Sequence, residues 1–403
     1  VDQMSGVQQD VPQLLAMMPK GTVEACDDIL SRLRGILPMV DQTLVLLKEG
    51  VRAGVTPPRI TLQDVPEQVE ALMVDDSALL RPLRERPESL GEKRREKIAS
   101  EAAKILETEI RPALRRLHGY LVETYIPVAR EAIGWSNLPD GAEWYAHAVK
   151  VHTTTDLTPR EIHELGRTEV KRIREEMERV IAGTGFPGSF AAFLNFLNTD
   201  RRFYFDTGEK LVQGYRDIAK RADAGLVRLF GRLPRLPYGV EPVPDFAEKS
   251  MPTAYYQPGS LEAGRPGIFH ANTYDLKTRP SWEMEALTLH EAVPGHHLQI
   301  ALAQEMQDVP AFRRFAFFTA FVEGWGLYAE SLGREMGFYT DPHSLFGRLT
   351  YEMWRAIRLV VDTGMHALGW SRQQAIDTFG EHAGRTDHEV LVEVDRYIVW
   401  PGQ

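Results

Sequence analysis

The sequence predicts a mainly α-helical protein with a small β-sheet beside the helices. Two long parts of the chain mix charged and apolar residues near a 3.6-residue period and lack the alternation of strands. Between them, residues 232–282 are too rich in Pro and Gly for helices and read as an irregular segment with a strand. Since neither repeats nor low-complexity tracts divide the chain, we expect one domain over residues 1–403.

Local signals place several of these elements. Residues 92–133 keep the helical period throughout. Farther along, Thr158 is expected to cap a helix, with Glu161 completing a capping box. Residues 267–275 (GIFHANTYD) are the clearest strand. Helices resume at Pro280 and continue almost to the end.

Composition excludes several classes of function. The formal net charge of −10 argues against a nucleic-acid-binding protein, which needs a basic surface. No apolar run of about eighteen residues occurs, so no membrane span is expected. The first residues do not resemble a signal peptide, which favours a cytoplasmic location, although the chain lacks an initial Met and could have lost an export signal. Cys26 is the single cysteine, so a metal site must use His and carboxylate ligands.

The stretch LTLHEAVPGHHLQIAL begins like the metal-binding helix of a zinc peptidase. His290 is followed by Glu291, as such a helix requires. A second histidine should follow four residues after the first, because residues at that spacing share one face of a helix. That position holds Pro294.

The next histidines come too late for a straight helix. His296 would lie about 9 Å farther along the axis than His290, and His297 about 10 Å. Pro294 cannot donate to the carbonyl of His290 and clashes with it, while Gly295 adds backbone freedom. The sequence therefore predicts a bulged or interrupted helix between residues 292 and 296. The plainer alternative is a helix end with no metal.

Glu323 is a candidate for a third ligand. It lies in the apolar segment 313–333, where a buried carboxylate is costly unless it is paired or bound to a metal. The gap after His296 fits a turn and a second helix packed antiparallel to the first. The alternative is that Glu323 faces solvent or pairs with an arginine. Glu330 is expected to face outward or to support a ligand.

Four stretches together resemble the bacterial family catalogued as domain of unknown function 885, and TTTDLTPREIHELG also fits it. The four are TLHEAVPGHHLQ, FVEGWGLYAE, RAIRLVVDTGMH and YIVWPGQ. Members of this family look like relatives of helical zinc peptidases such as angiotensin-converting enzyme, thimet oligopeptidase and carboxypeptidase Taq. Because family members usually extend past both ends of this sequence, the resemblance implies a chain trimmed at both ends.

The resemblance also implies a zinc site and its residues. His290 is then the first zinc ligand, Glu291 the general base and Glu323 the third ligand. His296 is preferred as the second ligand because it follows a glycine as in those peptidases, and His297 is the alternative. The related folds further imply a deep catalytic cleft edged by the small sheet.

Other residues could complete this site. Arg358, Asp362 and His366 fall on one helical face, so Arg358 could contact substrate and His366 could donate to an oxyanion or a substrate carboxylate. The alternative is a surface Arg–Asp pair with a partly buried histidine. Tyr397 is a further candidate donor.

In the related peptidases a strand before the metal helix aligns the substrate. The strand 267–275 holds that place here, so His270 and Asn272 would border the cleft, unless alternation turns them outward.

These residues predict zinc-dependent hydrolysis of short peptides by a carboxypeptidase or oligopeptidase. One alternative is a metal-dependent amidohydrolase that acts on a non-peptide amide. The other is a non-catalytic protein that binds a metal or a partner. The oligomeric state is not predicted.

Overall fold

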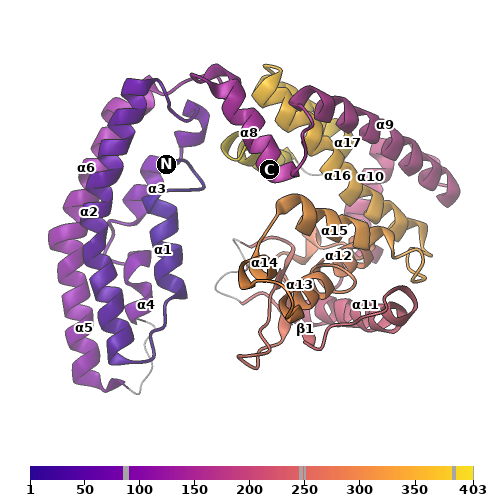
Figure 1. The fold of residues 1–403 in the computed structure, drawn as a ribbon, viewed down its shortest axis with the longest axis horizontal. Coiled ribbons are helices and arrows are strands. Elements are labelled where there is room, and N and C mark those ends of the chain that lie inside the picture. Colours follow the sequence, from indigo (N-terminus) through magenta and orange to yellow (C-terminus); the bar gives the residue numbers. More distant parts are fainter. Residues whose placement is uncertain (85–89, 245–247, 249–250, 384–386, 403) are drawn as a thin grey trace. The chain divides into compact units, whose positions relative to one another are not determined.

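The computed structural model describes the whole chain except residues 85–89, 245–247, 249–250, 384–386 and 403. The chain forms two compact units, drawn in Figure 1, where the sequence led us to expect one domain. Unit 1 comprises Val1–Tyr145, Met365–Gln373 and Leu391–Pro401, and unit 2 comprises Ala146–Gly364, Gln374–Val390 and Gly402–Gln403. Because the chain enters unit 1 three times, no single linker marks the division.

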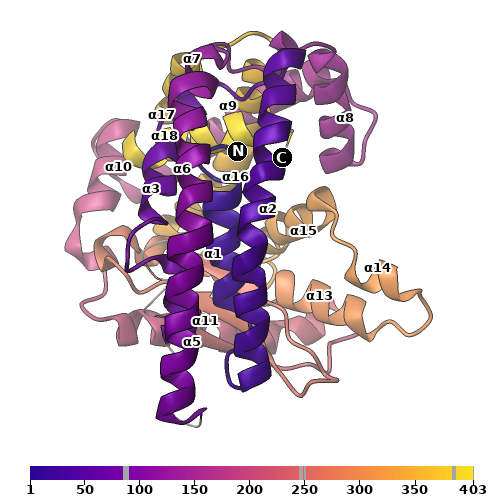
Figure 2. The same cartoon turned by 90° about the vertical axis from the view of Figure 1, so that its left-hand side faces the viewer.

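Unit 1 is built on long helices that run alongside one another (Figures 1 and 2). Its first helices are α1 (Val7–Met17), α2 (Val23–Ala53), α3 (Val65–Ala71) and α4 (Arg81–Arg84). Helix α2 packs against α5 and α6, and fully buried side chains such as Leu33, Val40 and Leu114 fill the space between these helices. Burial of these apolar side chains stabilises the unit.

The helical segment expected over residues 92–133 is confirmed as a helical run from Glu92 to Val128. Its parts are α5 (Glu92–Ile105), a π-helical turn (Leu106–Ile110), α6 (Arg111–Tyr120), a second π-helical turn (Leu121–Tyr125) and α7 (Ile126–Val128). Each π turn adds a residue to the helical turn without ending the helix.

Most of unit 2 is also helical, and the predicted capping box is present. The remaining helices of the chain, some of which have residues in both units, are α8 (Gly141–Thr153), α9 (Pro159–Thr184), α10 (Phe190–Thr199), α11 (Gly208–Leu229), α12 (Met284–Glu291), α13 (His296–Glu305), α14 (Ala311–Phe315), α15 (Thr319–Ser331), α16 (Pro342–Ala367), α17 (Arg372–Ala383) and α18 (Asp387–Val399).

At the start of α9, the Thr158 hydroxyl accepts the N–H of Glu161 at 3.3 Å. The Glu161 carboxylate accepts the N–H of Thr158 at 2.8 Å.

The small sheet holds three strands in the order β1-β3-β2. They are β1 (Tyr238–Pro242), β2 (Ala254–Gln257) and β3 (Gly267–Ala271). The central strand β3 pairs in parallel with β1 and antiparallel with β2. The strand expected over 267–275 is therefore present but ends at Ala271. The mainly α fold with a small sheet is confirmed.

Helices α11 and α12 pack against this sheet and so fix the position of the helix that carries His290. Phe269 of β3 is fully buried and meets Tyr215 of α11 edge to face, with ring centroids 5.1 Å apart. Helix α11 contacts both β1 and α12, and α12 also contacts β2. Among the described residues, no helix is long and apolar enough to cross a membrane.

Candidate metal centre

The helix that begins the signature ends directly after Glu291, as predicted, and a new helix starts at His296. The backbone leaves helical geometry at Ala292 (φ −97°, ψ −111°) and at Gly295 (φ −78°, ψ −131°). A Cβ atom at Gly295 would lie 1.9 Å from the carbonyl oxygen of His290, so only glycine fits at this turn. The break turns α13 so that His296 comes back beside His290.

Three side chains converge at this break, while helix α15 packs against both α12 and α13. The Nε2 atom of His290 lies 3.5 Å from one carboxylate oxygen of Glu323, and Nε2 of His296 lies 3.8 Å from the other. One donor atom from each of the three residues lies within 4.8 Å of the others. The two imidazole rings are nearly perpendicular, with centroids 4.6 Å apart.

This set of donors fits zinc. Two imidazoles and one carboxylate are common in catalytic zinc sites, where zinc lies about 2.0–2.2 Å from each ligand atom. Tetrahedral ligands at that distance are about 3.4 Å from one another. Small side-chain movements would therefore bring the donors of His290, His296 and Glu323 to this spacing.

A buried carboxylate contacts the ring nitrogen of His290 that does not face Glu323. The Nδ1 atom of His290 lies 2.8 Å from Oε1 of Glu330, whose side chain is 1% exposed. This contact fixes the ring orientation and leaves Nε2 to face Glu323, as carboxylate partners of metal-bound histidines do. The hydroxyl of Tyr339 in turn donates to the backbone carbonyl of Glu330 at 2.7 Å.

The charges of the cluster depend on one another. Burial disfavours a charged His290, but contacts with Glu323 and Glu330 outweigh this and raise the pKa of His290 to about 9. Burial and the positive charge of His290 lower the pKa of His296 to about 4. Burial opposes ionisation of Glu323, but its contact with His290 and the charges of both histidines lower its pKa to about 2. The ionisation of each of the three groups therefore depends on the charge of the other two.

Glu323 is less buried than its apolar sequence context led us to expect, because its side chain is 46% exposed. Burial still opposes its ionisation, so the argument that it needs a partner applies to the part of the carboxylate that is covered. Glu323 contacts the two histidines, since α15 places it opposite both.

Gly326, one turn after Glu323, allows α15 to approach His290 closely. A Cβ atom at this position would lie 2.5–2.8 Å from three atoms of the His290 ring. A Cβ atom at Gly324, on the same helix, would meet nothing within 4 Å. Gly326 therefore has a steric role at the site that Gly324 does not have.

We expect Gly326→Ala to weaken zinc binding at least ~10-fold, which is typical of changes that displace a metal-bound histidine. Zinc affinity measured by competition with a chromogenic chelator checks this. Gly324→Ala is the matched control and should bind zinc like the parent. Equal affinities in the two variants would show that the His290 ring is not held against α15.

His297 points away from the cluster. Its Nδ1 atom accepts from the Tyr256 hydroxyl at 2.9 Å, and its Nε2 atom donates to the carbonyl of Leu236 at 3.0 Å. Both ring nitrogens are therefore engaged in tying α13 to the segment that holds β1 and β2. Of the two histidines that the sequence left open as second ligand, the geometry groups His296 with His290 and Glu323.

Glu291 is the last residue of α12, beside His290. Burial raises the pKa of its carboxyl group, while the charge of His290 and the backbone N–H of Tyr256 act in the opposite direction. The negative charge of Glu323 also raises the pKa of Glu291, so the two carboxylates are close enough to interact. A carboxylate whose pKa is raised is a stronger base than an ordinary glutamate.

His366 and Tyr397, which both belong to unit 1, make their polar contacts within that unit. His366 is fully buried, with Nδ1 accepting from the N–H of Trp135 at 3.2 Å and Nε2 donating to the carbonyl of Tyr397 at 2.9 Å. The Tyr397 hydroxyl donates to Glu393. These contacts correct our expectation, because the donors of both side chains are used inside unit 1.

His270 and Asn272 are likewise engaged in the fold. His270 contacts the Gln257 side chain at 3.0 Å. The Asn272 amide donates to three backbone carbonyls, of Glu248, Met251 and Pro252. Because β3 is paired on both edges, it also cannot align a substrate as an added strand. In the part of the chain that the structure describes, β1 and β2 are the edge strands, so the place that we expected for β3 at the edge of the sheet is corrected.

An arginine that sequence reasoning missed acts on the cluster. The charge of Arg355 lowers the pKa of His290, Glu291, His296 and Glu323. Arg358, which we expected to contact substrate, is not among the residues whose charges affect these four pKa values most. The two arginines are three residues apart on α16, and helical period alone does not tell which of them faces the site.

Solved structures with this fold come from other bacteria. The chain is similar to the crystal structure of the putative lipoprotein from Colwellia psychrerythraea, with 29% identity and a TM-score of 0.93 over 100% of this chain and 71% of that one. It is also similar to a putative lipoprotein of unknown function from Shewanella oneidensis, with 15% identity and a TM-score of 0.61 over 98% and 67%. The second likeness shows the fold alone.

A search of curated proteins finds no match. The model of the family described as "Bacterial protein of unknown function (DUF885)" matches residues 1–403. The sequence stretches that suggested this family all lie within the matched residues, between the segment that contains Thr158 and the final residues. The chain therefore belongs to the bacterial DUF885 family.

Proposed function

We propose that this protein is a zinc-dependent peptidase that hydrolyses short peptides. The observation that carries the proposal is the convergence of His290, His296 and Glu323, with Glu291 next to the first of them. Three protein ligands leave a coordination position open, which is typical of catalytic zinc sites, whereas structural sites use four protein ligands.

The residues around the cluster then have distinct tasks. Zinc held at this cluster would polarise a substrate carbonyl and lower the pKa of a water molecule. Glu291 takes the proton of the attacking water and delivers it to the leaving amine, a task that its raised pKa favours. Glu330 keeps His290 in the orientation that directs Nε2 toward the cluster.

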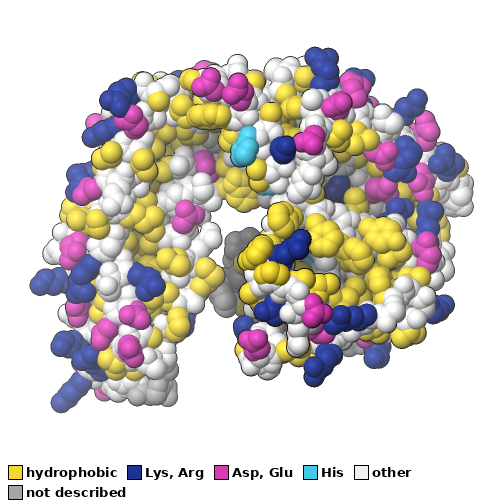
Figure 3. Space-filling model, in the orientation of Figure 1, with side chains coloured by type: hydrophobic (Ala, Val, Ile, Leu, Met, Phe, Trp, Pro, Cys, Tyr) yellow, Lys and Arg dark blue, Asp and Glu magenta, His cyan; other side chains and the backbone are white. Residues whose placement is uncertain are grey.

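The surface next to Glu323 favours a substrate with apolar side chains. Between α14 and the first turn of α15, five phenylalanines are 54–73% exposed: Phe312, Phe315, Phe317, Phe318 and Phe321. Figure 3 shows hydrophobic side chains gathered over this region. Exposed apolar surface of this kind is a mark of binding sites. Peptides carry such side chains, while many small non-peptide amides do not.

Metal content measured together with activity on a mixed peptide library tests the proposal. We expect about one zinc per chain, cleavage that a chelator abolishes, and recovery when zinc is restored. Bound zinc with no cleavage of any peptide would support a non-catalytic metal-binding protein. Cleavage of non-peptide amides alone would support an amidohydrolase. The cytoplasmic location expected from the sequence stays a prediction.

A further inference from the structure

Arg355 lies beside Glu330, the carboxylate that contacts His290, and its polar contacts with the described residues are long. It belongs to α16 and is 26% exposed. Its guanidinium donates to the carbonyl of Tyr351 at 3.4 Å and lies 3.9 Å from Glu330. The guanidinium also lies over the Tyr351 ring, 5.3 Å from its centroid. A guanidinium has five N–H groups, and its two polar contacts here are long.

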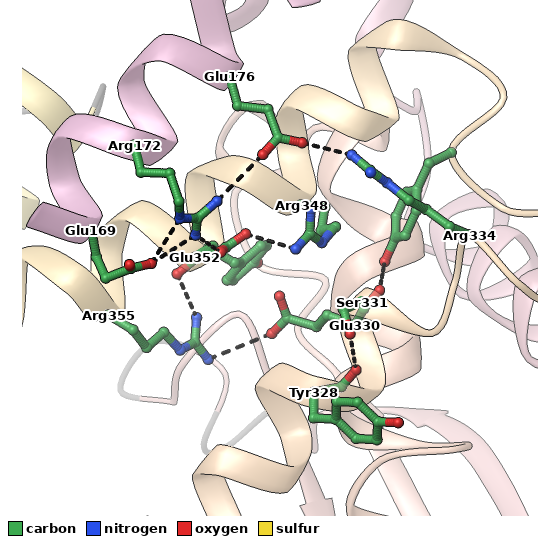
Figure 4. A network of polar contacts seen from close by, with 12 residues as sticks. Glu169, Arg172, Glu176, Tyr328, Glu330, Ser331, Arg334, Arg348, Glu352 and Arg355 are labelled. Atoms are coloured by element: carbon green, nitrogen blue, oxygen red, sulfur yellow. Dashed lines mark hydrogen bonds and ion pairs between the residues drawn. The ribbon is translucent and has the colours of Figure 1, made fainter.

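The nearby glutamates Glu352 and Glu176 form ion pairs with other arginines. Figure 4 shows Glu352 with Arg172 and Arg348, the latter at 2.7 Å. Glu176 pairs with Arg334, also at 2.7 Å. Glu330 has His290 at 2.8 Å, much closer than Arg355. Arg355 therefore has the longest ion-pair distance of the arginines in this network, 3.9 Å to Glu330.

Arg355 also lies within electrostatic range of the groups that would carry out the reaction. Its positive charge lowers the pKa of His290, His296 and Glu323, and that of Glu291. Its guanidinium lies 3.9 Å from Oε1 of Glu330, and that oxygen lies 2.8 Å from Nδ1 of His290, so a single carboxylate separates this partly exposed cation from the first candidate ligand. The planar fork of a guanidinium matches a carboxylate through two parallel hydrogen bonds. The carbonyl oxygen of the scissile bond would go to the metal, so a separate anionic group of the substrate is left for Arg355.

We propose that Arg355 binds the free terminal carboxylate of a peptide, so that the protein removes residues from the C-termini of peptides. This inference rests on the proposed peptidase function and names its substrate class. It assigns to Arg355 the substrate contact that the sequence suggested for Arg358.

Binding of matched peptides to the zinc-loaded full chain tests the inference. The probes are N-acetyl-Ala-Ala-Phe as the free acid, its C-terminal amide, and N-acetyl-Ala-Ala-Glu amide, which carries only a side-chain carboxylate. Titration calorimetry in a Glu291→Gln background measures affinity without turnover. We expect the free acid to bind at least ~10-fold more tightly than either amide, as for a charge-assisted pair of hydrogen bonds.

Arg355→Ala should abolish this difference, and Arg355→Lys should restore part of it, because lysine keeps the charge but not the fork. Arg358→Ala is the control and should keep the difference. The ratio of acid to amide affinities separates substrate binding from a structural role, since a disturbed Glu330 would weaken both probes alike. Equal affinity for acid and amide in the background protein, a difference that survives Arg355→Ala, or preference for the Glu amide would each overturn the inference.

The inference and the proposed function fail in different measurements. With Glu291 intact, no hydrolysis of the bound free acid would overturn the peptidase function and leave the carboxylate contact in place. Hydrolysis of the amide as fast as of the acid would overturn C-terminal removal and leave the peptidase function in place.

Discussion

Glu291→Gln should bind zinc like the parent protein and hydrolyse peptides at least ~100-fold more slowly. Glutamine keeps the size of glutamate and can hydrogen-bond, but it cannot accept a proton from water. General acid–base catalysis contributes about 10²–10⁴-fold to the rate, so the loss should fall in that range. Zinc content by mass spectrometry and initial rates on a peptide that the parent cleaves are the measurements.

Glu335→Gln is the control for this variant, because Glu335 is an exposed glutamate outside the cluster of His290, His296 and Glu323. It should hydrolyse the same peptide at the parent's rate. If Glu291→Gln also matches the parent, Glu291 is not the base. If Glu291→Gln loses its zinc, the slower rate reports metal loss and the assignment of Glu291 fails as well.

Glu323→Ala should lose most of the bound zinc while the protein stays folded. The variant removes one of three protein ligands, and two histidines alone do not form a zinc site of the usual kind. The fold should tolerate the change because the Glu323 side chain is 46% exposed and lies near the surface of α15. Zinc per chain after dialysis and the helical circular dichroism signal are the measurements.

Glu335→Ala serves as the matched control for this variant and should keep both zinc and helicity. Full zinc occupancy in Glu323→Ala would rule out Glu323 as a ligand. Loss of the helical signal would show that Glu323 supports the fold, contrary to its exposure.

The sequence predicted the parts of this fold that depend on local signals. The helical run from Glu92, the capping box at Thr158 and the strand at Gly267 follow from periodicity, capping and strand propensity. The break before His296 was predicted because Pro294 and Gly295 have strong local effects on the backbone.

Features that depend on tertiary packing could not be predicted in the same way. Two consecutive histidines give no local signal for which one turns toward His290, and the packing of His297 against Tyr256 and Leu236 decides it. The roles expected for His366 and Tyr397 have a similar origin, because sequence does not show that His366 contacts two backbone groups or that the Tyr397 hydroxyl donates to Glu393. Nor does it show that β3 is the central strand.

The central claim is that zinc binds where α12, α13 and α15 meet. Anomalous X-ray diffraction at the zinc edge, from crystals of the zinc-loaded protein, tests it most directly. The account predicts one strong peak about 2.0–2.2 Å from Nε2 of His290, Nε2 of His296 and a carboxylate oxygen of Glu323. A peak bonded by His297, a peak elsewhere in the chain, or no peak in zinc-loaded crystals would contradict it.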